Sequence, residues 1–132
     1  MNNKMIIYKE EKVKALNKIL LDIGGKNTNV IYDEETENIL IKGELFTYEM
    51  KHHIGTPGQC HRNATDLWDN NKDRLILCTG YALYENMWYC HSWLIDTKDD
   101  TIIETNPVTY EKYYGITLDH EESVLFVNGI WC

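Results

Sequence analysis

The sequence predicts a single α+β domain spanning residues 1–132, and three features of the chain support this prediction. The first is size, because 132 residues of which 43% are hydrophobic can bury a core without disulfides or metals. The second is a helical apolar stripe over residues 60–71. The third is a pair of long runs, 74–84 and 87–96, with apolar and aromatic residues on both faces. A helix packed on an antiparallel β-sheet is therefore the expected core.

Residues 1–54 are expected to decorate this core with a helix and a hairpin. Residues 10–23 place apolar side chains on one side and lysines opposite, which is typical of an amphipathic helix that stops at two glycines. Residues 29–32 and 39–42 are predicted to be strands around an acidic turn. The sequence of residues 45–54 is compatible with either a helix or a strand.

Residues 55–132 are expected to form the core itself. A Gly-Thr-Pro-Gly loop at residues 55–58 precedes the helix that begins at Cys60. The elements predicted after that helix are strands at 74–84 and 87–96 joined by a turn at Glu85-Asn86, a strand at 101–105, a helical turn at 110–114 and a strand at 123–127.

Charge and hydropathy exclude two classes of partner. The formal net charge is -8 and no basic block occurs, so nucleic-acid binding through phosphates is not expected. No apolar run approaches the ~20 residues that span a bilayer, and the N-terminus lacks the features of a signal peptide. We therefore expect a cytoplasmic protein that binds no membrane and whose cysteines are reduced, namely Cys60, Cys78, Cys90 and Cys132. Its oligomeric state is not specified by the sequence.

A metal site is not expected, although adjacent Cys-His pairs occur at Cys60-His61 and at Cys90-His91. Neighbouring residues on a strand point to opposite faces, so the second pair cannot converge on one ion. The chain also lacks the CxxC and HxxxH spacings of zinc sites. We expect neither a metal nor another cofactor.

Polar residues in a particular chain order predict a thiol nucleophile with its base. Cys60 heads a predicted helix, whose positive end lowers the pKa of a thiol. His91, on a predicted strand, would accept the thiol proton, and Glu104, on the next strand, would orient the imidazole and stabilise its cation. Asn106 shares a face with Glu104 and is the competing orienter. Backbone N–H groups at the helix start, with the side-chain amide of Gln59, would stabilise an oxyanion.

Several short motifs surround these residues. In order they are Gly58-x-Cys60 at a helix start, Gly80-Tyr81, His91-x-Trp93 and a hydrophobic strand ending in Glu104-Thr105. This series resembles the transglutaminase-like branch of the papain-like cysteine-enzyme superfamily, in which Cys, His and Asp follow in that order. The chain is also similar to short uncharacterised bacterial and phage proteins in the segments Cys60-His61-Arg62-Asn63-Ala64, Gly80-Tyr81-Ala82, His91-Ser92-Trp93-Leu94 and Tyr113-Tyr114-Gly115.

The resemblance covers residues 58 to about 115 and implies a papain-like or transglutaminase-like core. It also implies cysteine-dependent acyl transfer, in which a peptide, amide or ester bond is cleaved or exchanged by a peptidase, deamidase or transamidase. The implied substrate is a protein or a small amide or ester. Two positions depart from the pattern, because Glu104 stands in place of Asp and His61 in place of the aromatic residue that often follows the nucleophile.

Four further residues are expected to line the cleft beside the nucleophile, namely His61, Asn63, Tyr81 and Trp93. The alternative to an enzyme is a non-catalytic binding or inhibitor protein, of phage origin, that keeps the same fold. Thiol reactivity separates the two hypotheses, because a binding protein has no reason to keep Cys60 ionised at neutral pH.

Overall fold

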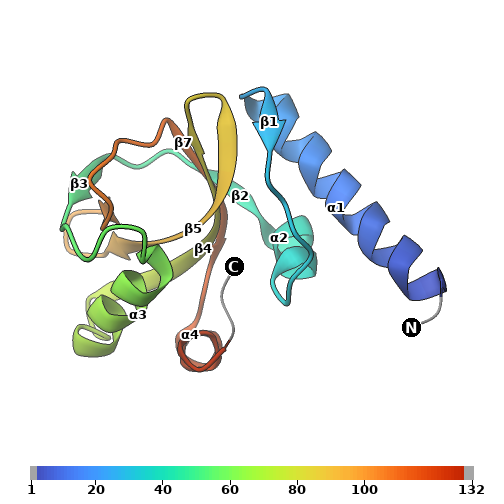
Figure 1. The fold of residues 1–132 in the computed structure, drawn as a ribbon. Coiled ribbons are helices and arrows are strands. Elements are labelled where there is room, and N and C mark those ends of the chain that lie inside the picture. The colour runs from blue at the N-terminus through green and yellow to red at the C-terminus, as the bar shows by residue number, and fades with distance from the viewer. Residues whose placement is uncertain (1–2, 130–132) are drawn as a thin grey trace.

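The computed structural model describes residues 3–129. These residues form a mixed α+β fold in which helices lie outside a curled, mainly antiparallel sheet (Figure 1). The elements in chain order are α1 (Asn3–Ile23), β1 (Asn27–Thr28), α2 (Thr36–Lys42), β2 (Glu44–Phe46), β3 (Met50–His52), α3 (Cys60–Asn70), β4 (Leu75–Tyr84), β5 (Met87–Asp96), β6 (Thr101–Glu104), β7 (Lys112–Thr117) and α4 (His120–Val127). The predicted α+β class is confirmed. Within the described range, no helix combines the length and the apolar character needed to cross a membrane.

The long hairpin of β4 and β5 is the centre of the sheet, whose strand order is β2-β7-β4-β5-β6-β3 with β1 added in parallel to β5. The hairpin pairs every residue from Leu75–Asp96 at its open end to Tyr84–Met87 at its turn. Glu85 and Asn86 form that turn with φ values of 47° and 68°, the left-handed conformation that two-residue hairpin loops require. Both predicted long strands and the turn between them are confirmed.

One edge of β5 is only partly paired. Residues 87 and 88 pair with β1, and residues 94–96 pair with β6. Neither ladder includes residues 89–93 of the described chain. The helix α3 packs against β4 and β5, and His61 in its first turn contacts Cys90 and Ser92 in this gap. The opening allows the start of α3 to approach residues from both faces of β5.

Apolar side chains form one cluster on each face of the sheet. The larger cluster lies between the sheet and the helices and includes Leu16 and Leu20 of α1 with Ala64 and Trp68 of α3. The smaller cluster lies inside the curl of the sheet, and its members are Phe46, Cys78, Ala82, Trp93, Ile95, Ile102 and Tyr113. Alternation along β5 explains the division, because consecutive residues of a strand point to opposite faces.

The N-terminal third differs from the predicted decoration. The strands predicted at 29–32 and 39–42 are wrong, because residues 39–42 belong to α2 and, among residues 3–129, the strand nearest the first segment is β1 at residues 27–28. The helix α2 buries Thr36 and Ile39, which are one turn apart, and it packs on α1. The ambiguous segment 45–54 supplies β2 and β3, which occupy the two ends of the strand order. Residues before 55 are therefore part of the sheet and its core.

Two predictions near the C-terminal end are also wrong. The expected helical turn at 110–114 overlaps β7, which pairs with both β2 and β4. The expected strand at 123–127 lies in α4. This helix begins with a capping box, in which the Asp119 side chain accepts from the N–H of Glu122 and the Glu122 side chain accepts from the N–H of Asp119. That Asp-x-x-Glu signal is visible in the sequence and identifies the helix start.

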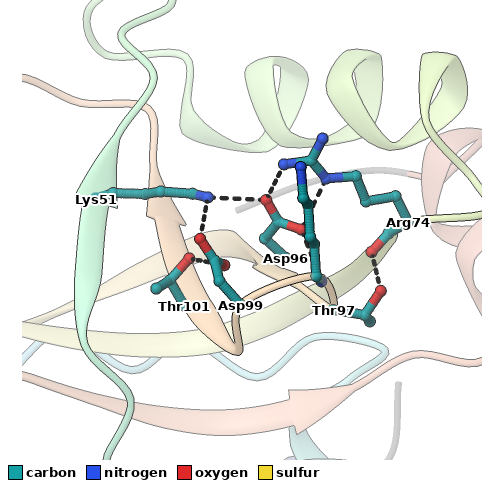
Figure 2. Close-up of polar contacts among 7 residues, drawn as sticks. Lys51, Arg74, Asp96, Thr97, Asp99 and Thr101 are labelled. Atoms are coloured by element: carbon teal, nitrogen blue, oxygen red, sulfur yellow. Dashed lines mark hydrogen bonds and ion pairs between the residues drawn. The ribbon is translucent and has the colours of Figure 1, made fainter.

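A buried carboxylate ties one end of the sheet together. Asp96, whose side chain is 1% exposed, accepts hydrogen bonds from Nε and Nη2 of Arg74 at 2.8 and 2.6 Å. It also accepts one from Nζ of Lys51 at 2.8 Å. Figure 2 shows the two cations approaching this carboxylate from different sides, with Asp99 also bound to Lys51. The cluster joins the starts of β4 and β6 to β3, the strand that pairs with β6 up to Glu104.

Candidate active site

Cys60 is the first residue of α3 and follows a tightly held loop. The Asn63 side chain accepts from the N–H of Thr56 at 3.1 Å and donates to its carbonyl at 2.8 Å. Gly58 has a φ of 78°, which glycine adopts readily. Gln59 is the N-cap residue, and its side chain makes no capping hydrogen bond. The first N–H groups of a helix have no intrahelical acceptor, so donors are available beside Cys60.

His91 lies in the part of β5 that pairs with β4 but not with β6, and only 1% of its surface is exposed. Its Nε2 is 2.7 Å from Oε1 of Glu104. Because a carboxylate only accepts hydrogen bonds, Nε2 carries a proton and donates it to this contact. Cys60 lies close enough to the imidazole to raise the pKa of His91, and Nδ1 is the ring nitrogen that does not contact Glu104. The structure thus places Cys60 near His91, whose Nε2 is hydrogen-bonded to Glu104.

Glu104 is fully buried at the end of β6 and has three donors. Besides His91, the hydroxyl of Tyr113 donates to Oε1 at 2.7 Å and the backbone N–H of Asn106 donates to Oε2 at 2.9 Å. The side chain of Asn106 instead donates from Nδ2 to the hydroxyl of Tyr110 at 3.2 Å. Of the two expected orienters, Glu104 is therefore the one placed on His91 by its side chain.

The electrostatics of the site favour an ion pair. Burial raises the pKa of Cys60, but the nearby imidazoles of His61 and His91 lower it to about 5. Burial also opposes a charge on His91, whereas the hydrogen bonds with Cys60 and Glu104 raise its pKa to about 9. Between about pH 5 and 9, the thiolate and the imidazolium coexist.

Aromatic rings enclose the imidazole of His91. The ring centroid of Tyr110 lies 4.5 Å from it and that of Trp93 lies 6.1 Å from it, the latter nearly parallel at 20°. Tyr113 completes the enclosure at 6.2 Å. Such packing holds the ring in one orientation and keeps water from the bond to Glu104.

The expected cleft residues take different positions. His61 is buried beside Cys60 and contacts Ser92 and Cys90. Asn63 holds the loop before Cys60, and Trp93 is a fully buried neighbour of His91. For Tyr81 the expectation is wrong, because strand alternation directs its side chain into the helix-side cluster, away from the face that bears His91.

Three contributors to the site were missed by the sequence analysis, namely Ser92, Tyr110 and Tyr113. The Tyr113-Tyr114-Gly115 segment lies partly in the predicted helical turn at 110–114, and a helical prediction hides the alternation of a strand. In β7, Tyr113 and Tyr114 point to opposite faces, and Tyr113 reaches Glu104. Strand alternation over residues 112–117 is the sequence signal that points to Tyr113.

The other cysteines have different environments. Cys78 is fully buried, and burial raises the pKa of its thiol. Cys90 is disulfide-bonded, so the expectation that it is reduced is wrong. Cys132 lies outside the described residues. Between residues 3 and 129, no three His, Cys, Asp or Glu side chains are grouped as a metal site would require.

Comparisons of the chain with protein-family models, with curated proteins and with solved structures found no match. The interpretation of the site therefore depends on its own geometry and chemistry.

Proposed function

We propose that this protein is a cysteine-dependent acyl-transfer enzyme with a Cys60-His91-Glu104 triad. The observation that carries the proposal is the hydrogen bond between His91 and the fully buried Glu104, close to the thiol of Cys60, whose pKa His61 and His91 lower. A thiolate paired with an imidazolium is a strong nucleophile at neutral pH, and the third group holds the base in one tautomer.

The reaction follows from these positions. The thiolate of Cys60 attacks the carbonyl carbon of an amide or ester, and the oxyanion accepts hydrogen bonds from N–H groups at the start of α3 and from the Gln59 amide. The Nδ1 proton of His91 passes to the leaving amine or alcohol, and a thioester remains on Cys60. Water or an amine then attacks the thioester, and His91 takes a proton from the attacking molecule. The acyl group is released, and the thiolate of Cys60 is restored. Hydrolysis, deamidation and transamidation all use this scheme.

The arrangement of the elements supports a papain-like or transglutaminase-like core. The nucleophile begins a helix packed on the sheet, the base lies on β5, and the acid lies on the adjacent β6 in the same chain order as in that branch. The substrate class is a protein or a small amide or ester. A non-catalytic binding protein with this fold is the alternative that the following experiments exclude or support.

The first experiment is the pH dependence of iodoacetamide alkylation at each cysteine, followed by peptide mass spectrometry. In the wild type we expect half-maximal reactivity of Cys60 near pH 5, compared with about pH 8.5 for an ordinary thiol. In His91→Ala the midpoint should rise, because the cation that stabilises the thiolate is lost. Buried Cys78 serves as the internal control. Ordinary behaviour of Cys60 in the wild type would refute the enzyme proposal and favour the binding protein.

A second experiment measures turnover with a p-nitrophenyl ester, because an activated ester reacts with nucleophilic thiols of unknown specificity. We expect a burst of about one equivalent of p-nitrophenol, then slower steady release as the thioester is hydrolysed. Cys60→Ala should lose both phases, and His91→Ala should lower the rate by about 10²–10⁴-fold. A burst without steady release would mean that the thiol is activated but deacylation does not occur with this acyl group.

A further inference from the structure

The carboxylate of Glu104 accepts two side-chain hydrogen bonds on the same oxygen atom. Nε2 of His91 lies 2.7 Å from Oε1 of Glu104, and the hydroxyl of Tyr113 also lies 2.7 Å from this atom. A carboxylate can only accept, so both groups donate to it. All three residues are buried. Tyr113 therefore shares with His91 the negative charge of one buried oxygen.

The sheet and its aromatic residues hold Tyr113 at this position. The strand β7, which carries it, pairs with β2 on one side and with β4 on the other. The ring of Tyr113 packs against those of Trp93 and Tyr110, with centroids 5.1 and 5.8 Å away. Burial, followed by the charge of Glu104, keeps the pKa of Tyr113 well above its usual range. Its hydroxyl is therefore a neutral donor at every pH at which the site would operate.

The hydrogen bond from Tyr113 changes how strongly Glu104 attracts the imidazolium of His91. A hydrogen bond to a carboxylate stabilises its ionised form, and such bonds are stronger in the low dielectric of a buried site than in water. Two donors on one oxygen weaken each other, because each offsets part of the same negative charge. The imidazolium is therefore held less firmly than it would be by Glu104 without Tyr113.

We propose that Tyr113 is a positioning residue of the site, which acts through Glu104 and makes the His91 cation a better proton donor. The inference rests on the proposed function, because it concerns the same base. In the step affected, the Nδ1–H bond of His91 breaks and its proton forms a bond with the leaving amine or alcohol. The Nε2–H group remains hydrogen-bonded to Glu104. Because Tyr113 offsets part of the attraction between Glu104 and the imidazolium, this transfer requires less free energy.

Titratable groups of three other segments lie around the imidazole of His91. Burial lowers the pKa of His91, whereas Cys60 of α3 and Glu104 of β6 raise it to about 9. Tyr110, in the loop before β7, lies against the imidazole with ring centroids 4.5 Å apart. Among residues 3–129, however, Tyr113 is the only tyrosine that is hydrogen-bonded to Glu104. The two tyrosines therefore form a matched pair for an experiment.

The test is an NMR titration of the His91 ring protons in the wild type and in Tyr113→Phe, with His91→Ala used to assign the signals. Phenylalanine keeps the ring that packs against Trp93 and removes only the hydroxyl. We expect the pKa of His91 to rise from about 9 by up to about one pH unit, which corresponds to a net neutral hydrogen bond. Tyr110→Phe is the matched control and should titrate like the wild type, because the Tyr110 hydroxyl accepts from Asn106.

The direction of the shift distinguishes this inference from a purely structural role. If Tyr113 only held Glu104 in place, loss of its hydroxyl would loosen the carboxylate, and the pKa of His91 would fall. A fall or a wild-type titration in folded Tyr113→Phe would therefore overturn the inference and leave the triad intact. In the background of Glu104→Gln, Tyr113→Phe should no longer raise the pKa of His91, because the hydroxyl acts through the carboxylate. An equal rise in that background would also overturn the inference.

3-Fluorotyrosine in place of Tyr113 provides a second measurement if Tyr113→Phe fails to fold by circular dichroism. It keeps the hydroxyl and makes it a stronger donor, so the pKa of His91 should fall. An unchanged or raised pKa in this protein would overturn the inference. A wild-type His91 with the ordinary pKa of about 6.5, together with ordinary alkylation of Cys60, would instead refute the proposed function itself.

Discussion

Glu104 shows how much of the site depends on a single side chain. Its two oxygens receive hydrogen bonds from His91, from Tyr113 and from the backbone of Asn106, and no part of it is exposed. A carboxylate with three donors has one orientation, and it transmits that orientation to the imidazole.

Replacing Glu104 by Gln should lower the pKa of His91 from about 9, because the hydrogen bond and charge of Glu104 raise it. The imidazolium would then lose its proton at lower pH, and the alkylation midpoint of Cys60 would rise. The measurement is an NMR titration of the His91 ring protons together with the alkylation profile.

Asn106→Ala is the matched control, since its side chain contacts Tyr110 and only its backbone contacts Glu104. We expect it to titrate like the wild type. A wild-type titration in Glu104→Gln combined with a lowered His91 pKa in Asn106→Ala would reassign the orienting residue to Asn106.

Between elements, the close approach of β4 and β7 is decisive for the site. Gly80 of β4 pairs with Gly115 on one side and with His91 on the other. A Cβ on Gly80 would lie 2.2 Å from the carbonyl oxygen of Tyr114, and one on Gly115 would lie 2.2 Å from that of Thr79. Glycine at both positions therefore lets β7 bring Tyr113 to Glu104.

Gly80→Ala and Gly115→Ala should each destabilise the fold by about 1–3 kcal/mol or more, because backbone atoms must move apart. The measurement is urea unfolding followed by circular dichroism. Gly58→Ala is the comparison, since a Cβ there meets nothing within 4 Å and the cost comes from its positive φ alone, about 1 kcal/mol. Equal stability of all three variants would contradict the packing argument.

Over the whole molecule, the Asp96 cluster holds together strands that are remote in sequence. It connects Lys51 of β3 and Arg74 before β4 to Asp96 at the end of β5 (Figure 2). The hydrogen bonds from Arg74 and then Lys51 outweigh burial and hold the pKa of Asp96 well below its usual range. Since β3 pairs with β6, this cluster supports the strand that ends at Glu104.

Asp96→Asn should lower the melting temperature at pH 7, because two cations lose their shared anion. A carboxyl group whose pKa is lowered on folding contributes stability above its unfolded pKa, about 3.9. That contribution decreases as pH falls toward the folded-state pKa. The difference in melting temperature between wild type and variant should therefore shrink below about pH 4.

Asp99→Asn is the control for this prediction, since Asp99 binds the same Lys51 but is exposed. It should change the melting temperature little, as exposed ion pairs contribute about 0–1 kcal/mol. A pH-independent difference between wild type and Asp96→Asn would show that the variant acts through packing rather than charge.

Local sequence signals were sufficient for several parts of this protein. The glycine-rich approach to Cys60 and the helical stripe after it predict the start of α3, and the Glu85-Asn86 turn predicts the central hairpin. These features depend on backbone preferences within a few residues. The chain order of Cys60, His91 and Glu104 likewise predicts the chemistry of the candidate site, because each residue type has a defined role in it.

Other features were decided only by contacts between distant segments. The run Ile39-Leu40-Ile41 suits a strand or a helix, and the packing of Ile39 against the core makes it a helix. Residues 112–117 become a strand because β2 and β4 pair with them. Contacts between distant segments also decide three features of the site. They place Glu104 rather than the side chain of Asn106 on His91, bring the hydroxyl of Tyr113 to Glu104, and bring His61 to Ser92. Pairing and burial depend on partners far away in the chain, so the sequence by itself determined the candidate groups of the site, and the tertiary structure decided which atoms hold them in place.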